Sequence, residues 1–441
     1  MRKVIFFSML LVAGLGLSQV LPSLLGGAHD VTVVLVRVLT TIGLAFIMIH
    51  VGFEFHINKS RLGSYGWDYF VAFTAASLPW VFVSCYFVFV LLPSGLWGDF
   101  AAWKETLLAG RFAAPTSAGV LFGMLAAAGL GATWIFKKAR VLAIFDDLDT
   151  VLLMIPLKVF MVGVAWQLGV LVIIMMALLV AAYLWLHRLR IPVTRGWVLF
   201  YAAFIVAVSE ALYSGSKVID PSVPIHIEVL LPAFVLGCLA VPRSVKVNEG
   251  PEAVEREFTR MLDRPGEKRA AFIVSAMFMF FVGLSMPVVF GGPDLQHPAP
   301  VAAELHAAAP SCVVDDPEVH GGCLVGRYAT TVTAGQPAIG WGMILFHVLM
   351  VTLISNLGKM FPAFCYRRQA HWRHRLALAI GMWPRGEVGA GILVLSISYG
   401  IGGPIVTVAM LSLALNLVLT GVFIIMVKKL VGGVPELPQG G

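Results

Sequence analysis

The chain has 441 residues, of which 59% are hydrophobic and only 12% are charged. Soluble domains carry about 25% charged residues, so this composition excludes an ordinary soluble protein and indicates a membrane protein. The net charge of +7 does not indicate nucleic-acid binding, because the basic residues form short clusters between apolar runs. No basic stripe alternates with stacking aromatic residues, as a nucleic-acid surface would require.

Twelve apolar runs, in chain order, are long enough to be predicted as membrane-spanning helices. The predicted fold is all-α and polytopic, and it forms a single membrane domain over residues 1–441. The predicted helices cover residues 3–25, 30–53, 66–93, 105–129, 138–161, 164–187, 196–214, 224–242, 270–290, 338–365, 375–400 and 403–427.

Lys and Arg are distributed unevenly between the segments that join these helices. If the N-terminus lies inside, the outside segments hold only Lys104, Lys217 and Arg327. Because basic residues are retained on the cytoplasmic side, both termini are predicted to be cytoplasmic, as in a bacterial inner-membrane protein. Residues 1–20 also resemble a signal peptide, and its removal would leave eleven helices with the same topology.

The longest predicted outside segment is the extracytoplasmic loop 291–337. It contains Cys312 and Cys323, which would be able to form a disulfide if the loop faces an oxidising compartment. The other cysteines, Cys85, Cys238 and Cys365, lie in or beside apolar runs, where a buried thiol is the simplest expectation.

An internal repeat is indicated by two matched features. The second and ninth predicted helices both end near a Val-Gly pair, at Gly52 and Gly283, and two helices later each half has a mid-span proline, Pro115 or Pro384. The two units start an odd number of helices apart, so they would be inverted in the membrane. Inverted repeats with interrupted helices are typical of secondary transporters, and discontinuous fourth and eleventh helices are predicted here. A single proline would be explained by a simple kink, but the matched pair favours interruption.

The fifth predicted helix contains Asp146, Asp147 and Asp149 in an otherwise apolar span. Ionisable groups at membrane depth are costly and by default indicate function. Adjacent helical residues point about 100° apart, so Asp146 and Asp147 cannot face the same point. One is expected to face a cavity and the other a neighbouring helix, with Asp149 as a supporting group near the site. Capping of a helix end at the membrane boundary is the alternative interpretation.

Two further helices contribute intramembrane charges. Lys359 lies in the tenth predicted helix and has Asp146 as an available partner, although a lysine at this depth would also be able to snorkel to the interface. Arg385 and Glu387 flank the glycine after Pro384 in the eleventh helix, and we expect them to form a structural ion pair at the helix break.

Four segments, in this order, resemble monovalent cation/proton antiporters, and most closely the second cation/proton antiporter family. They are 114–121 (APTSAGVL), 138–149 (KARVLAIFDDLD), 356–359 (NLGK) and 384–389 (PRGEVG). The resemblance implies an ion-binding core formed by helices in 66–161 and 338–427. It also implies a dimerisation or scaffold part in 3–53 and 196–290, a homodimer, an elevator-like movement, and no cofactor.

The resemblance also implies individual roles. Asp147 would bind the cation or the proton, Asp146 would pair with Lys359, and Thr116 with Ser117 would supply polar groups at the helix break. Family members with this Asp-Asp pair tend to be electrogenic.

The expected function is therefore proton exchange for a monovalent cation, most simply Na⁺, with K⁺ or Li⁺ as alternatives, and not enzymatic catalysis. Pro115, Phe145 and the third acid Asp149 depart from the family pattern and leave the cation preference open. Two other classes remain as alternatives: a transporter of the same fold for an organic anion or another solute, and an intramembrane aspartyl protease.

Overall fold

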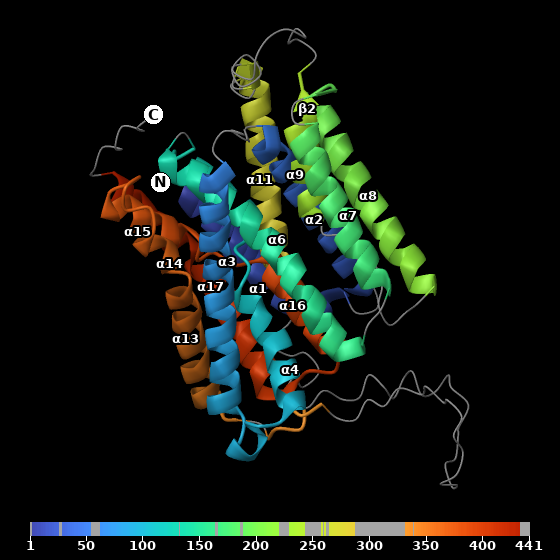
Figure 1. Ribbon diagram of the computed structural model, residues 1–441, viewed down its shortest axis with the longest axis vertical. Coiled ribbons are helices and arrows are strands. Elements are labelled where there is room, and N and C mark those ends of the chain that lie inside the picture. Colours follow the sequence, from blue (N-terminus) through green and yellow to red (C-terminus); the bar gives the residue numbers. More distant parts are fainter. Residues whose placement is uncertain are drawn as a thin grey trace.

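The computed structural model describes residues 2–25, 29–53, 62–131, 133–163, 166–185, 188–219, 229–242, 257–258, 260–261, 264–286, 331–337 and 339–432. The described chain is mostly helical and contains almost no strand (Figure 1). Cys312 and Cys323, with most of the loop 291–337, lie outside the described residues, so the predicted disulfide stays a prediction.

Each of the twelve predicted ranges contains helix. In chain order the helices are α1 (Arg2–Leu25), α2 (His29–Phe53), α3 (Leu62–Tyr86), α4 (Phe100–Gly110), α5 (Ala118–Ala127), α6 (Trp134–Val162), α7 (Trp166–Leu184), α8 (Arg195–Ile219), α9 (Leu230–Leu239), α11 (Pro265–Leu284), α13 (Trp341–Gly358), α14 (Phe361–Phe364), α15 (Trp372–Gly381), α16 (Glu387–Ser398) and α17 (Gly403–Val431). A π-helical turn, η3 (Phe87–Leu91), extends α3, and two short strands, β1 (Leu189–Arg190) and β2 (Ala240–Val241), pair in parallel.

Seven helices among the described residues are long and apolar enough to cross a membrane. They fall in α1, α2, α3, α7, α8, α13 and α17, and two shorter apolar helices, α9 and α16, accompany them. These helices identify a membrane-embedded protein, because soluble folds do not contain so many long apolar helices.

The outer surface of α13 illustrates how the chain meets its surroundings. Met343, Phe346 and Leu353 are about half exposed, whereas Ser355 and Asn356 are buried against the rest of the protein. Apolar groups outside and polar groups inside are the arrangement that a hydrocarbon environment favours.

Two of the predicted ranges are interrupted, as the paired prolines indicated. The first run consists of α4, a 3₁₀ turn η5 (Arg111–Ala113) and α5, with residues 114–117 between η5 and α5 outside any helix. The second consists of α15 and α16, separated by non-helical residues 382–386. Pro115 and Pro384 have no backbone N–H to continue a helix, and Ser117 starts α5 by accepting a hydrogen bond from the Val120 N–H at 3.4 Å.

The helices gather in two groups (Figure 1). One contains α2, α7, α8 and α9, with α1 packed on α11 and α11 on α2; the other contains α3, α4, α6, α13, α15 and α17. Figure 1 shows α8 and α13 on opposite sides of the molecule. The two interrupted helices lie in or beside the second group, where α16 contacts α4 and η5.

Two glycine pairs bring helices of the first group into backbone contact. A Cβ added to Gly14 of α1 would overlap the carbonyl oxygen of Phe280 and lie 3.1 Å from the Cα of Gly283 in α11. In the same way, a Cβ on Gly52 of α2 would lie 2.8 Å from the Cα of Gly237 in α9. Such close approach through small residues is how membrane helices gain packing energy without a hydrophobic driving force.

The α1–α11 contact predicts a sharp difference between two glycines of the same helix. Gly14→Ala is expected to lower the free energy of unfolding by about 1–3 kcal/mol, because its Cβ meets backbone atoms that cannot move aside. Gly16→Ala, which has no atom within 4 Å of the new Cβ among the described residues, is the matched control and is expected to be neutral or slightly stabilising. Thermal unfolding of both variants in lipid nanodiscs measures the difference, and equal melting temperatures would contradict the contact.

Candidate functional site

The two interrupted helices cross and contact each other at their breaks. The Ser117 N–H donates to the Pro384 carbonyl oxygen at 3.0 Å, and the Thr116 hydroxyl donates to the Met382 carbonyl oxygen at 3.1 Å. Thr116 and Ser117 are buried. Each break therefore satisfies backbone groups that the other leaves without a helical partner, as buried backbone at membrane depth requires.

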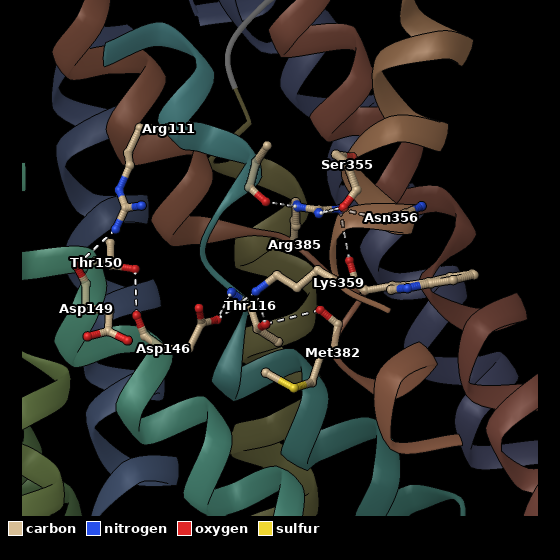
Figure 2. Close-up of polar contacts among 12 residues, drawn as sticks. Arg111, Thr116, Asp146, Asp149, Thr150, Ser355, Asn356, Lys359, Met382 and Arg385 are labelled. Carbon is tan, nitrogen blue, oxygen red and sulfur yellow. Dashed lines mark hydrogen bonds and ion pairs between the residues drawn. The ribbon is translucent and has the colours of Figure 1, made fainter. Parts of the chain in front are cut away.

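Asp146 of α6 enters this crossing from the side (Figure 2). Its Oδ2 accepts hydrogen bonds from the Thr116 N–H at 2.7 Å and from Lys359 Nζ at 2.9 Å. Lys359 Nζ also donates to the Thr116 hydroxyl oxygen at 2.8 Å. Both Asp146 and Lys359 are fully buried, so the structure brings together the acid and the lysine that the sequence predicted to be partners.

Lys359 reaches this point because α13 ends there. Lys359 follows the last residue of α13, and its N–H donates to the Asn356 carbonyl oxygen at 3.1 Å. From this position its ammonium group contacts Asp146 and Thr116 in the crossing rather than an interface. The snorkelling alternative therefore does not describe its position in this structure.

Arg385 and Glu387 make hydrogen bonds to different groups, and the ion pair that we expected between them stays a prediction. Among the described residues, the buried Arg385 guanidinium donates to the Ala113 carbonyl oxygen at 2.9 Å, to Asn356 Oδ1 at 2.7 Å, and to main-chain oxygens of Ser355 and Trp383. Its hydrogen bonds therefore join α13 to the break between η5 and α5. The physical reason is that non-helical backbone offers carbonyl oxygens, and a rigid five-donor fork fits several of them at once.

Glu387 contacts the other side of the crossing. Its Oε2 accepts a hydrogen bond from the Ser117 hydroxyl at 2.6 Å, which links the first turn of α16 to the start of α5. A carboxylate at the start of a helix is also favoured by the helix dipole. Glu387 thus positions the two half-helices relative to each other.

Asp147 lies on a different face of α6 from Asp146. It lines a small hollow, with the other walls formed by apolar side chains of α2, α7, α9 and α16. Among the described residues that line this hollow, Asp147 is the only charged one; the others are Met48, Ile144, Leu148, Thr150, Met175, Leu230, Leu231, Phe234 and Val388. The hollow therefore places the Asp147 carboxyl group, both oxygens of which are buried, between the two helix groups.

Asp149 is fully buried one turn beyond Asp146. Its main-chain oxygen accepts a hydrogen bond from Arg111 Nη2 at 3.0 Å (Figure 2). The Arg111 guanidinium also lies over the Trp80 ring at 4.7 Å. The sequence predicted Asp149 as a supporting group, but it did not indicate Arg111 as its neighbour.

A second buried charge cluster escaped sequence reasoning. Both oxygens of Asp68, near the start of α3, accept hydrogen bonds from Lys138 Nζ at 3.0 Å, and Asp68 Oδ1 also accepts one from the Tyr366 hydroxyl at 2.8 Å. Burial, and then the Asp68 carboxylate, raises the pKa of the Tyr366 hydroxyl, so it remains a hydrogen-bond donor. The cluster joins α3, α6 and the segment after α14. The position of Asp68 within an apolar run was the one available sequence signal.

Glu105 of α4 makes a third buried contact that the sequence did not indicate. Its carboxylate accepts hydrogen bonds from the N–H groups of Val332 and Thr333 at 3.1 and 2.9 Å and from the Thr333 hydroxyl at 2.8 Å. These bonds fix the segment before α13 against the middle of α4.

No known protein-family model matches this chain, and the search of curated proteins gave no match. The described residues also contain no group of three or more His, Cys, Asp and Glu side chains that would hold a metal ion. The functional interpretation therefore rests on the geometry of the crossing and of the hollow.

The buried Asp146–Lys359 contact predicts strong non-additivity between two substitutions. Asp146→Asn and Lys359→Met are each expected to lower the free energy of unfolding by about 3–5 kcal/mol, because each leaves a buried charge without its partner. The double variant is expected to lose much less than the sum, since both charges are then gone. Chemical denaturation in detergent micelles measures this cycle.

Lys429→Met, at an exposed position near the end of α17, is the matched control and is expected to leave stability unchanged. Additive losses in the double variant would show that the two charges do not interact in the folded protein.

Proposed function

We propose that this protein is a secondary transporter that exchanges protons for a monovalent cation across the bacterial inner membrane, and so serves pH homeostasis. Asp147 is the proposed carrier, binding the cation and the proton in turn. The observation that carries the proposal is the contrast between two neighbouring acids. Asp147 lines the hollow between the helix groups, whereas the carboxylate of Asp146 is held by Lys359 and Thr116.

The proposed coupling is electrostatic. A carboxylate in a low-dielectric hollow is costly, so Asp147 favours a state in which either a proton or a cation neutralises it. Either ligand would let the ion-binding part cross the membrane barrier, while the bare carboxylate would be held back. Asp146 and Lys359 remain together and, as an ion pair, add no net charge to the moving part. Electrogenic exchange is favoured only by the resemblance to family members with the Asp-Asp pair.

The packing supports a moving part and a fixed part. The crossing of the interrupted helices, within helices of 66–161 and 338–427, would form the moving core, and the helices of 3–53 and 196–290 would form the scaffold and the homodimer contact. The two glycine pairs also support an inverted repeat: α2 contacts α9 through Gly52, and α11 contacts α1 through Gly283. In an inverted repeat α2 and α11 would be equivalent, as would α1 and α9, so the two contacts would be equivalent too.

The alternatives are less well supported. A protease dyad requires two aspartates that face each other and share a proton, whereas Asp146 and Asp147 face different surroundings and Asp146 contacts a lysine. An organic-anion transporter would require basic groups in the hollow. The buried basic groups Lys359, Arg385 and Arg111 instead bind other parts of the protein.

The carrier role of Asp147 is tested by Asp147→Asn. In everted vesicles this variant is expected to lose cation-dependent proton movement by at least tenfold while still inserting, because the amide can neither release a proton nor neutralise a cation. The measurement is the fluorescence of a pH-sensitive dye after addition of Na⁺, K⁺ or Li⁺.

Glu210→Gln is the control, because it removes another acid from a spanning helix, α8, outside the crossing and the hollow. It is expected to retain full exchange. Exchange that survives in Asp147→Asn would eliminate Asp147 as the carrier.

A further inference from the structure

A group of buried polar atoms on the Asp146 side of α6 has no hydrogen-bond partner among the described residues. The group consists of Asp146 Oδ1 and of Nε and Nη1 of Arg111, and it lies beside the Asp149 carboxyl group, with which the Tyr69 hydroxyl interacts. Asp146, Arg111 and Asp149 are fully buried. Native proteins leave only a few such atoms unsatisfied per 100 residues, because each costs about 1–3 kcal/mol.

These atoms belong to one place in the fold. Asp149 follows Asp146 by three residues, so both point to the same side of α6. Arg111 is fixed there by its bond to the Asp149 main-chain oxygen (Figure 2) and by its contact with the Trp80 ring. Among the described residues, its Nε and Nη1 are buried donors without acceptors, and Asp146 Oδ1 is a buried acceptor without a donor.

The surroundings of Asp149 are mixed in charge. Arg111 approaches from η5 and Lys359 from the end of α13, while Asp146 lies on the same helix and the Tyr69 hydroxyl faces the carboxyl group from α3. The two cations and the Tyr69 hydroxyl support the ionised carboxylate, whereas the Asp146 carboxylate opposes it. The opposing effects suit a group that changes its protonation state.

The Arg111 guanidinium offers hydrogen-bond donors, and the neighbouring carboxyl groups offer acceptors. Ordered water bridges groups of this kind when they do not contact each other directly. Water donates two hydrogen bonds and accepts two, so it would be able to satisfy Arg111 and the carboxyl oxygens together. A metal cation fits less well, because the Arg111 guanidinium would repel it.

We propose that ordered water joins Arg111, Asp149 and the free oxygen of Asp146, and that Asp149 takes up and releases a proton there, as a second proton-binding site separate from Asp147. The proton passes between the Asp149 carboxyl oxygen and the adjacent water, and no other bond forms or breaks. The use of this proton in exchange rests on the proposed function, but its binding does not.

Infrared difference spectroscopy tests the site without any transport. The full chain in lipid vesicles carries Asp147→Asn, so that the proposed carrier is silent, and spectra at mildly acidic and alkaline pH are subtracted. A protonated-carboxyl band that shifts in D₂O is expected to appear on acidification. Adding Asp149→Asn is expected to remove that band.

The matched control is Asp68→Asn in the same background, because Asp68 is a buried acid whose oxygens accept hydrogen bonds from Lys138 and Tyr366. It is expected to leave the band unchanged. If Asp149→Asn does not fold, Asp149→Glu replaces it, and the added methylene group is expected to shift the band. Any of three results would overturn the proposal. The Asp147→Asn protein would show no band, the band would persist after Asp149→Asn is added, or Asp149→Glu would leave the band unshifted. A band assigned to Asp149 in a protein that exchanges no cation would instead overturn only the proposed function.

Discussion

The buried ion pair between Asp146 and Lys359 stabilises the crossing of the two interrupted helices, and the proposed ion-binding core depends on that crossing. Breaking a helix inside a membrane frees backbone groups that lipid cannot satisfy. Asp146 satisfies one of these groups, because its carboxylate accepts a hydrogen bond from the Thr116 N–H at the first break. Lys359 donates hydrogen bonds to both Asp146 and the Thr116 hydroxyl oxygen. Removing either charge would leave the other in a low-dielectric interior, so the broken helices and the ion pair depend on each other.

The geometry of one helix gives three acids three different surroundings. A turn of about 100° per residue sends Asp147 to the apolar hollow while Asp146 faces the crossing. Asp149 returns to the side of Asp146 but meets the guanidinium of Arg111 rather than an ammonium group. A single run of sequence thus supplies a structural anion, a proposed carrier and a proposed second proton site.

Local chemistry made the helix breaks and the Asp146–Lys359 pair predictable from the sequence. Pro115 and Pro384 cannot continue a helix, and a buried lysine in an apolar run has few candidate partners. The contacts of Arg385 were not predictable, because its acceptors are mainly main-chain oxygens that become available only once the helices break. Arg111 near Asp149, and Lys138 near Asp68, are likewise pairs from distant segments that no spacing rule relates.

The central claim is that cation and proton compete for Asp147 while Asp146 stays bound to Lys359. Counting the protons released by purified protein in weakly buffered micelles on addition of Na⁺, K⁺ or Li⁺ tests it most directly. The account predicts that at least one of these cations releases protons in a saturable manner, and that Asp147→Asn releases none. Equal release from the wild-type protein and from Asp147→Asn, or no release with any of the three cations, would contradict it.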